Sequence, residues 1–359
     1  MSAFTRLSVK DESFKDFLIT DDFSIIDAIK SLNINKKIVY VISSENNELV
    51  GSMTDGDVRR SLLLGQDVNE SISCAMNKKT HFLYDNSSDQ DCLNLLKENK
   101  ISSAPILDAN KNIIEFIFIS KKSEGAKYKN HDFDKSALIM AGGFGTRLLP
   151  LTSNCPKPML PINNKPMLEL IINNLIKHDF KKIYISVHYL ADQIKDYFGD
   201  GEKFNIEIDY LEEEKPLGTA GCLHGLRKKI TNPFLVMNGD IITSVDFNGL
   251  MSFHLNQESD ATMVVRPQEI KSDFGVVSTK DLDIVGFEEK PVYVSYINTG
   301  IYILNSNIFN YLDGDKKDMP DLFLDMQKNG LKTVAYPMHE DWKDIGNINE
   351  YNEIKNAKI

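Results

Sequence analysis

The sequence lacks the features that would place it in a membrane or on nucleic acid. No apolar stretch of its 359 residues is long enough to cross a bilayer, and residues 1–16 are polar, without the apolar centre of a signal peptide. The net charge of −11 and the absence of a Lys/Arg-rich run argue against a nucleic-acid surface. We therefore expect a cytoplasmic protein that binds neither membranes nor nucleic acid.

Cysteine and histidine are too dispersed to form a structural framework. The four cysteines are Cys74, Cys92, Cys155 and Cys222. They lie far apart and without the spacing of metal ligands, so they are expected to be reduced thiols. The seven histidines form no His-Glu-x-x-His cluster.

A glycine-rich turn stands at the centre of what is present. The apolar run Ser136–Met140 predicts a buried strand, and apolar residues at helical spacing predict a helix over residues 165–180. Between them lie Gly142, Gly143 and Gly145, whose backbone amides can close around phosphate oxygens.

Arg147 and Lys157 add positive charge beside this turn. Two better-known glycine motifs do not fit. The dinucleotide fingerprint requires a glycine where this chain has Leu148, and the P-loop requires a Gly-Lys-Ser/Thr end that is absent.

Two aspartates are candidate ligands of Mg²⁺. Asp240 follows an apolar strand expected over residues 233–237, and Gly239 permits a tight turn there. The alternative is a plain Asn-Gly turn. Asp344 supplies a second carboxylate, although it could instead cap a helix that starts at Asn347.

From Lys135 onward, predicted strands and helices alternate, which indicates a doubly wound α/β domain over residues 135–359. Ligands are expected at the carboxyl ends of its strands. Strands are expected at 181–187, 205–211, 233–237, 261–266, 274–278, 284–288 and 296–304, and helices at 191–198 and 219–228.

Residues 1–125 read as one unit used twice. A strand, a polar turn and a strand over residues 39–50 are repeated over 104–114. Helices are expected before each, over 24–32 and 89–98, with short extended pieces before those. The polar, charged residues that follow predict a linker, which we place at 126–134.

The turn and the Pro-Lys-Pro-Met run after it resemble the signature of the sugar-1-phosphate nucleotidyltransferases, L-A-G-G-x-G-T-R-L…P-K-P-M, with Met140 for the first leucine. Pro-Leu-Gly-Thr-Ala-Gly, Glu-Lys-Pro, Asn-x-Gly-x-Tyr and Trp-x-Asp-Ile-Gly extend the resemblance to nearly all of residues 136–346. It implies a Rossmann-like, GT-A-like domain. The resemblance implies that Arg147, Lys157, Asp240 and Lys290 are catalytic and that Asp240 and Asp344 hold Mg²⁺. The nucleotide-binding residues it implies are Ala141, Gly142, Gly143, Gly145, Thr146, Gly218 and Thr219. The sugar-binding residues it implies are Gly275, Glu288 and Asn298.

The N-terminal repeat resembles a tandem CBS pair. The family pattern puts Thr54 near a nucleotide phosphate and Asp57 on ribose hydroxyls, before a helix that starts near Val58. An adenine nucleotide is therefore a possible ligand. The second half lacks Thr-x-x-Asp, so the alternative is a helper domain that only packs against itself or a second chain.

The substrates implied are a nucleoside triphosphate and a sugar-1-phosphate. The motifs resemble the mannose-1-phosphate guanylyltransferase branch, and a CBS pair ahead of such a domain resembles the glucosamine-1-phosphate guanylyltransferases of legionaminate biosynthesis, so GTP and a hexose or hexosamine phosphate are expected. UTP, CTP and a non-catalytic nucleotide-sugar sensor remain alternatives. A homo-oligomer is expected, and no hexapeptide-repeat tail follows Asp344.

Overall fold

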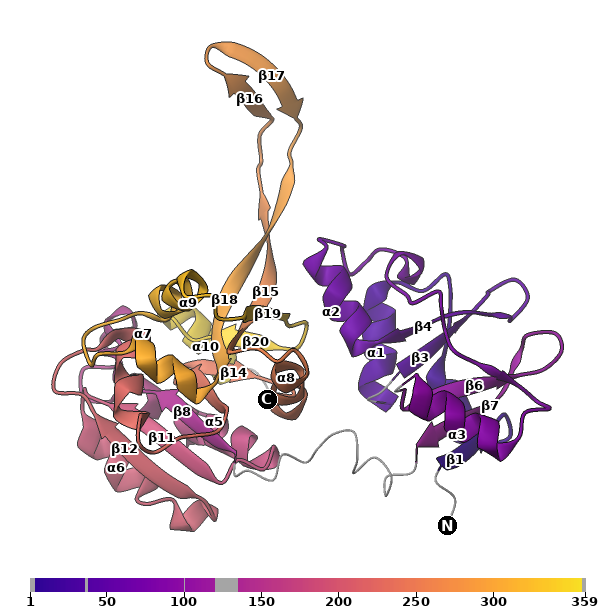
Figure 1. Ribbon diagram of the computed structural model, residues 1–359. Helices are drawn as coiled ribbons and strands as arrows, with labels where there is room; N and C mark the ends of the chain where they lie inside the picture. The colour runs from indigo at the N-terminus through magenta and orange to yellow at the C-terminus, as the bar shows by residue number, and fades with distance from the viewer. Residues whose placement is uncertain (1–3, 36–37, 100, 120–134, 357–359) are drawn as a thin grey trace. The chain divides into compact units, whose positions relative to one another are not determined.

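The computed structural model describes residues 4–35, 38–99, 101–119 and 135–356. The chain divides into two compact units, Met1–Asp132 and Phe133–Ile359, each described here by itself (Figure 1). The linker expected at 126–134 lies outside the described residues. No helix among the described residues is long and apolar enough to span a bilayer.

The first unit contains the repeat that the sequence predicts. In the first copy β2 is parallel to β3 and β3 is antiparallel to β4, and β5, β6 and β7 repeat this pairing. The bounds are β1 (Phe4–Ser8), β2 (Leu18–Thr20), α1 (Ile25–Asn35), β3 (Ile38–Ile42), β4 (Leu49–Thr54), α2 (Asp55–Leu63), β5 (Leu83–Tyr84), α3 (Asp89–Glu98), β6 (Ser103–Leu107) and β7 (Ile113–Ile119).

A buried aromatic cluster joins the two copies. The Tyr40 ring of β3 stacks on Phe116 of β7 with centroids 4.9 Å apart, and the Tyr40 hydroxyl lies 2.9 Å from Oγ of Ser103. Burial without a charged partner raises the pKa of Tyr40, so the hydroxyl stays neutral. Strand β1 extends the second sheet by pairing with β7, giving the order β1-β7-β6-β5.

The second unit is built on a mixed seven-stranded sheet of order β12-β11-β8-β13-β18-β15-β19. Strands β12, β11, β8 and β13 are parallel, whereas β18 runs antiparallel to both of its neighbours. These strands are β8 (Ser136–Met140), β11 (Lys182–Val187), β12 (Glu207–Glu212), β13 (Phe234–Asn238), β15 (Ala261–Lys271), β18 (Val292–Leu304) and β19 (Thr333–Pro337).

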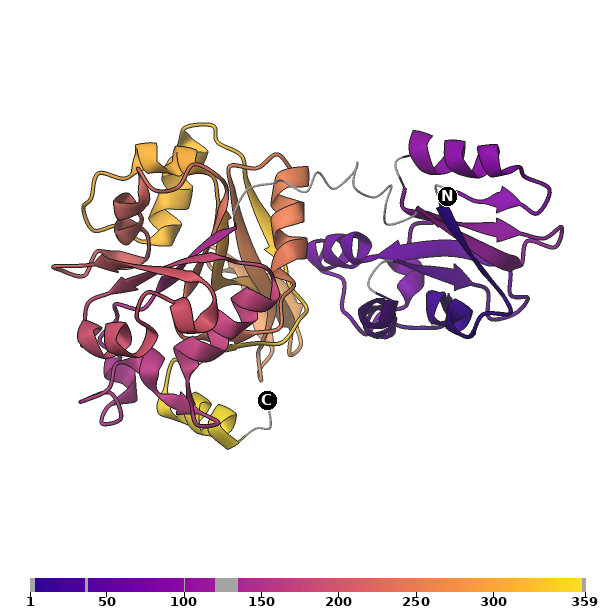
Figure 2. The same ribbon diagram turned by 90° about the horizontal axis from the view of Figure 1, so that it is seen from below.

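Alternate side chains of this sheet enter two cores. Ile139 of β8 and Met237 of β13 belong to one buried cluster, and Leu138 and Val236 belong to the other. Figures 1 and 2 show helices on both faces, as burial on both sides requires. They are α5 (Met167–Lys177), α6 (Ala191–Phe198), α7 (Gly218–Gly221), α8 (Phe247–Asn256), α9 (Met319–Lys328) and α10 (Ile348–Asn356).

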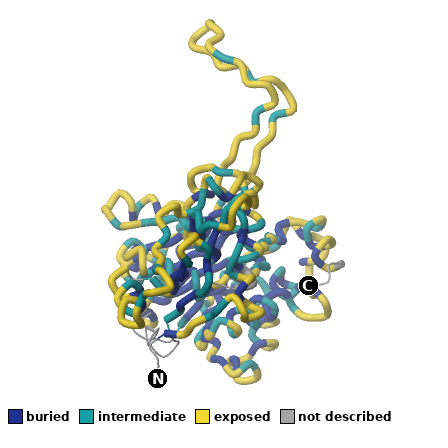
Figure 3. Tube along the Cα trace, turned by 90° about the vertical axis from the view of Figure 1, so that its right-hand side faces the viewer, coloured by how far each residue is buried: buried dark blue, intermediate teal, exposed yellow. Residues whose placement is uncertain are grey.

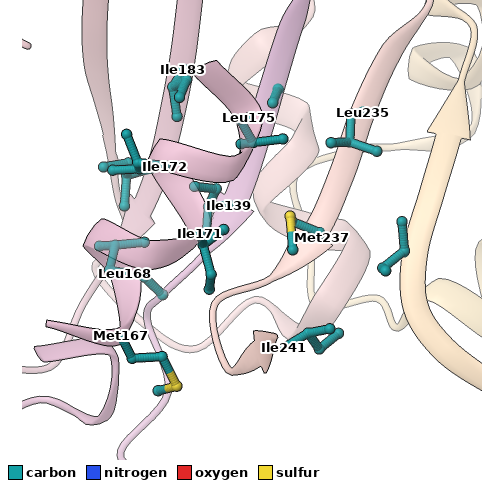
Figure 4. Close-up of a cluster of buried hydrophobic side chains, with 14 of the residues drawn as sticks. Ile139, Met167, Leu168, Ile171, Ile172, Leu175, Ile183, Leu235, Met237 and Ile241 are labelled. Atoms are coloured by element: carbon teal, nitrogen blue, oxygen red, sulfur yellow. The ribbon is translucent and has the colours of Figure 1, made fainter. Parts of the chain in front are cut away.

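Helix α5 shows why the predicted amphipathic stripe folds as it does. Leu168, Ile171, Ile172 and Leu175 lie on one helix face and pack on β8, β11 and β13 (Figure 4). Fully burying each such side chain stabilises the fold by about 1.5–3 kcal/mol. This helix anchors the chain that follows the glycine-rich segment.

Two of the predicted elements that differ from the structure show a physical reason for the difference. The helix expected over residues 219–228 is one α-helical turn, α7, followed by a 3-10 helix at Cys222–Leu226. The amides of Ala220 and Gly221 bond to the carbonyl of Lys317 rather than to a preceding turn, so a distant segment interrupts the helix. The strand expected from Asn205 begins at Glu207, because Asn205 adopts a left-handed conformation.

The last strands form a long ribbon. Strands β15 and β18 run together beyond the sheet and carry the hairpin β16 (Val276–Lys280) and β17 (Asp283–Glu288) at their far end (Figure 1). Two smaller pairs complete the unit: β9 (Pro161–Ile162) with β10 (Lys165–Pro166), and β14 (Ile241–Thr243) with β20 (Trp342–Asp344).

Candidate active site

The glycine-rich segment leaves the carboxyl end of β8 as an irregular loop. The amide of Ala141 donates to a backbone carbonyl of β11 at 2.9 Å, which fixes the start of the loop. Gly145 has a φ of 65°, and a Cβ there would lie 2.9 Å from Cγ2 of Thr152, so a side chain does not fit. Gly143 is exposed, and a Cβ there would meet nothing within 4 Å. The backbone near Gly143 is therefore open to an anion.

The two candidate metal ligands lie on neighbouring segments. Asp240 follows β13, and Asp344 is the last residue of β20, where it pairs with Ile241. The amide of Ile345 donates to the carbonyl of Asp240 at 3.0 Å. The Oδ1 atoms of Asp240 and Asp344 are both buried and have no hydrogen-bond partner. Burying a hydrogen-bond acceptor without a partner costs free energy, and two such carboxylate oxygens occur here on neighbouring segments.

Two cationic side chains lie beside these carboxylates. Lys157 Nζ forms an ion pair with Asp240 Oδ2, with both side chains at most 21% exposed. A Cβ built on Gly346 would lie 3.4 Å from Arg147 Nη1 and 3.7 Å from Asp344 Oδ2, so these two side chains approach the same glycine. The loop, both aspartates and both cations are thereby gathered at one edge of the sheet.

The pKa of Asp344 is raised from its ordinary value. Burial is the main cause and the neighbouring charge of Asp240 adds to it, whereas Lys157 and Arg147 act in the opposite direction. A cation bound by both carboxylates would stabilise their charged forms.

The described residues contain no group of three or more His, Cys, Asp or Glu that could hold a metal ion alone. An ion bound here would take oxygen ligands from Asp240 and Asp344 and complete its coordination with water or phosphate. This is how Mg²⁺ is commonly held in sites that bind nucleotides.

A pocket of about 330 Å³ adjoins Asp344. Its lining is Thr219, Asn238, Ile241, Asn298, Thr299, Gly300, Tyr302, Asp318, Pro320, Trp342 and Asp344. Asn298 donates to the Tyr302 hydroxyl at 2.7 Å and accepts from the Gly300 amide at 2.9 Å, so its amide orientation is fixed. Burial raises the pKa of Tyr302 to about 12. Asn298 and Tyr302 therefore present neutral, hydrogen-bonded groups to the pocket.

The loop that contains Gly218 and Thr219 is fastened to the segment before α9. A Cβ on Gly218, whose φ is 75°, would lie 2.6 Å from Asp318 Oδ1. The Thr219 amide donates to Asp318 Oδ1 at 3.1 Å, and the Thr219 hydroxyl accepts from the Met319 amide at 2.7 Å. Close packing thus requires glycine at position 218. Thr219 lines the pocket, and its hydroxyl oxygen already accepts one hydrogen bond.

Three predicted site residues lie elsewhere. Gly275, Glu288 and Lys290 are exposed residues of the ribbon beyond the sheet, and none of them lines the pocket. Lys290 has a φ of 45° at the turn between β17 and β18. The structure therefore assembles the glycine loop, both aspartates and Asn298, and leaves the Glu-Lys-Pro segment apart from them.

In the N-terminal unit, Thr54 and Asp57 contact each other. Helix α2 begins at Asp55 rather than near Val58, with Thr54 as its N-cap. Asp57 Oδ2 accepts from the Thr54 hydroxyl at 2.6 Å and from the Thr54 amide at 2.9 Å, which is a capping box. Both side chains thus have a structural role whether or not a nucleotide binds.

Sequence reasoning missed Asp318, which lines the pocket, and Glu350, and it gave no role to Tyr302, the last residue of the Asn-x-Gly-x-Tyr motif. Glu350 accepts from the amides of Gly346 and Asn347, and Asn347 accepts from the Glu350 amide. Asn347 therefore caps α10, and the alternative that Asp344 does so is wrong. The Asn-x-x-Glu spacing was a readable signal for this cap, whereas nothing local marks Asp318.

Comparisons with known proteins fit this arrangement. The family model described as Nucleotidyl transferase matches residues 136–359. A UTP–glucose-1-phosphate uridylyltransferase of Synechocystis sp. is 36% identical over 62% of this chain, which spans 65% of that relative's length. A D-glycero-alpha-D-manno-heptose 1-phosphate guanylyltransferase of Campylobacter jejuni is 36% identical over 60% of this chain and 96% of its own. A crystal structure described as a glucose-1-phosphate thymidylyltransferase of Bacillus anthracis matches 63% of this chain and 97% of its own, with 25% identity and a TM-score of 0.52.

Proposed function

The chain belongs to the nucleotidyl transferase family, and from this premise we propose that it joins a sugar-1-phosphate to a nucleoside triphosphate and releases pyrophosphate. The observation that carries the proposal is the pair of buried, unpartnered Oδ1 atoms on Asp240 and Asp344, next to Lys157 and an open glycine loop. Acidic and basic groups arranged in this way suit a reaction between two anions.

In the proposed reaction, a phosphate oxygen of the sugar-1-phosphate attacks the α-phosphorus of the triphosphate. The bond from that phosphorus to the bridging oxygen breaks, and pyrophosphate leaves with the electron pair. The loop amides near Gly143 and the Arg147 guanidinium bind and orient the triphosphate. Lys157 neutralises charge on the phosphates, and no covalent nucleophile is required.

Magnesium is the cofactor we propose. Hard carboxylate oxygens are the ligands it prefers, and Asp240 and Asp344 supply two that have no other partner. When bound, the ion would offset the negative charge that builds up between the two substrates. Asp240 would exchange part of its ion pair with Lys157 for the metal, which frees the Lys157 ammonium for phosphate.

We propose GTP as the nucleotide, on the resemblance of the motifs to the mannose-1-phosphate branch. The relatives include guanylyl- and uridylyltransferases by name, so UTP is the main competitor and CTP the next. We further propose a hexosamine phosphate as the sugar. The described residues lining the pocket include the carboxylate of Asp318 and no Lys, Arg or His, which favours a sugar that carries an ammonium group.

For the N-terminal unit we propose a tandem CBS pair that binds an adenine nucleotide through Thr54 and Asp57. The support is the twofold repeat of strand pairing together with the Thr-x-x-Asp sequence after β4. The second candidate for the whole chain is a sensor that binds a nucleotide sugar without turning it over.

Pyrophosphate release separates these possibilities. The purified chain is assayed with GTP, UTP, CTP and dTTP, each against glucosamine-, mannose- and glucose-1-phosphate, with and without Mg²⁺ and with added AMP or ATP. The proposal predicts magnesium-dependent release that is fastest with GTP and glucosamine-1-phosphate. Release with UTP and glucose-1-phosphate alone would correct the substrates and leave the reaction standing. No release with any pair, despite measurable nucleotide binding, would support the sensor.

A further inference from the structure

The pocket beside Asp344 is lined by two kinds of residue. Tyr302 of β18 is buried, whereas Asp318, directly before α9, is exposed. The ribbon that carries Glu288 and Lys290 is exposed along almost its whole length, and neither of these two residues lines the pocket (Figure 3). Among the described residues, the charged side chains that line the pocket are therefore the two carboxylates, Asp318 and Asp344.

The two carboxylates differ in whether a cation is already assigned to them. Asp344 is one of the two residues that we assign to the metal ion. Asp318 forms no ion pair with any residue that the structure describes. Its neighbour Lys317 pairs instead with Asp325 at 2.7 Å and donates to the carbonyl of Tyr311 at 2.9 Å. The negative charge of Asp318 is thus not neutralised by the adjacent lysine.

The hydrogen bonds of Asp318 leave one carboxylate oxygen open. An aspartate at the N-cap of a helix commonly accepts from an amide of the first turn, but Asp318 does not cap α9 in this way. The hydroxyl of Thr219 accepts from the Met319 amide instead, at 2.7 Å. Asp318 Oδ1 accepts from the Thr219 amide at 3.1 Å, while Oδ2 has no hydrogen bond among the described residues. This second oxygen is therefore available to a ligand in the pocket.

The chemistry of the pocket indicates which ligand group suits this oxygen. Sugar hydroxyls can bind to neutral side chains, which Asn298 and Tyr302 already supply. A carboxylate only accepts hydrogen bonds, and its bond to a cationic donor is about twice as strong as a bond between neutral groups. The described lining contains no Lys, Arg or His, so a cation that complements Asp318 has to come from the substrate.

We propose that Asp318 selects the sugar, by accepting a hydrogen bond on Oδ2 from the ammonium group of a hexosamine phosphate. This inference rests on the proposed function and goes beyond it by assigning the choice of sugar to one carboxylate at the start of α9. Asp318 takes no part in the bond changes at phosphorus. A sugar with a hydroxyl in place of the ammonium group makes a weaker hydrogen bond at this position, and that difference in affinity is the specificity.

The test compares Asp318→Asn with Asp321→Asn. Asparagine keeps an oxygen that can accept from the Thr219 amide and removes the charge. Asp321 is exposed, lies in the first turn of the same helix and does not line the pocket, so its replacement is a matched control. For the wild type and both variants, kcat/KM is measured with GTP and Mg²⁺ against glucosamine-1-phosphate and glucose-1-phosphate.

The wild type and Asp321→Asn should prefer glucosamine-1-phosphate, and the ratio of the two kcat/KM values should fall at least about 10-fold in Asp318→Asn. The preference of the wild type should also decline as rising pH removes the proton from the ammonium group of the substrate, and this pH dependence should be lost in Asp318→Asn. An equal loss with both sugars overturns the proposal, because Asp318 would then only hold Thr219 in place. A wild type that does not distinguish the two sugars also overturns it.

Sugar binding separates a failure of this inference from a failure of the proposed reaction. Calorimetric titration of each sugar phosphate, with a non-hydrolysable GTP analogue present, requires no turnover. If no pyrophosphate is released, but tighter binding of glucosamine-1-phosphate is lost in Asp318→Asn, the role of Asp318 stands and the reaction does not. If pyrophosphate is released and the sugar preference is unchanged in Asp318→Asn, the reaction stands and the role of Asp318 does not.

Discussion

The edge of the sheet near Asp344 and the ribbon of residues 267–297, called the arm, carry motifs of the same family pattern, yet the two regions differ in how firmly their residues are held. At the sheet edge, Lys157, Asp240 and Asp344 are enclosed by strand pairing, an ion pair and buried neighbours. On the arm, Glu288 and Lys290 are exposed on a ribbon with free edges.

This difference shows that a sequence motif determines the position of its residues in one region and does not do so in the other. The position of a residue at the carboxyl end of a buried strand is determined by backbone hydrogen bonds to the neighbouring strands and by the packed cores on both faces of the sheet. A residue on a two-stranded ribbon is placed only by whatever packs against that ribbon. The predictions below test this contrast, starting with the firmly held residues.

Replacing Asp240 should have the largest effect. Asp240→Asn keeps the size of the side chain but removes the charge that pairs with Lys157, so we expect pyrophosphate release to fall at least about 100-fold. Steady-state kinetics with saturating substrates measures it. Asp192→Asn, an exposed aspartate in the first turn of α6, serves as the control and should turn over normally. If Asp240→Asn is as active as this control, the Asp240 carboxylate has no role in the reaction.

Lys290→Ala asks whether the arm takes part in the reaction. If the arm brings Lys290 to a sugar phosphate, turnover should fall about 100-fold. Lys280→Ala, another exposed lysine on the arm at the end of β16, provides the matched comparison and should have little effect. Equal rates for the two variants would show that the Glu-Lys-Pro segment is only part of a surface.

The sheet edge should also be sensitive to a single methyl group. Gly300 has a φ of 73°, and a Cβ there would lie 2.5 Å from Nδ2 of Asn238, so Gly300→Ala should cost about 2–4 kcal/mol of unfolding free energy. Gly330 has a similar φ of 76° but open space around it, so Gly330→Ala should cost only about 1–2 kcal/mol.

Fluorescence of the single tryptophan, Trp342, follows denaturation of this unit. Similar losses for the two alanine variants would mean that backbone strain alone, rather than the contact with Asn238, requires glycine at position 300.

The smallest effect is expected in the N-terminal unit, where two aspartates close equivalent capping boxes and one of them, Asp57, also pairs with Arg60. Asp57 caps α2 with Thr54, and Asp91 caps α3 with Ser88 in an equivalent capping box. Asp57→Asn and Asp91→Asn should each cost about 1 kcal/mol or less. Only Asp57→Asn should weaken AMP binding, by about 10-fold in a calorimetric titration. Equal AMP affinities would leave Asp57 with a structural role alone.

Much of the second unit follows from its sequence. Short apolar runs and helical apolar spacing predicted β8, α5, β11 and α6 with boundaries within a few residues, because burial on both sheet faces leaves those segments few alternatives. The N-terminal repeat was predicted from the strand–turn–strand pattern of residues 39–50, which recurs over residues 104–114. The short α7 was not, since the carbonyl of Lys317 that interrupts it is about a hundred residues away in the chain.

The candidate site divides in the same way. The glycine loop and Asp240 were readable because each follows a predicted strand, whereas Asp344 was found through the Trp-x-Asp-Ile-Gly motif. Asp318 was not, because only the fold brings it to Thr219 and the pocket. The resemblance assigned Gly275, Glu288 and Lys290 a role, but no local pattern in the sequence determines where a ribbon will lie.

Binding of Mn²⁺, used as a probe for Mg²⁺, tests most directly whether Asp240 and Asp344 hold a metal together. Electron paramagnetic resonance of the full chain with a non-hydrolysable GTP analogue counts the bound ions without requiring turnover. We predict one tightly bound ion per chain, lost in both Asp240→Asn and Asp344→Asn and kept in Asp192→Asn. Unchanged Mn²⁺ binding in the first two variants would contradict the account.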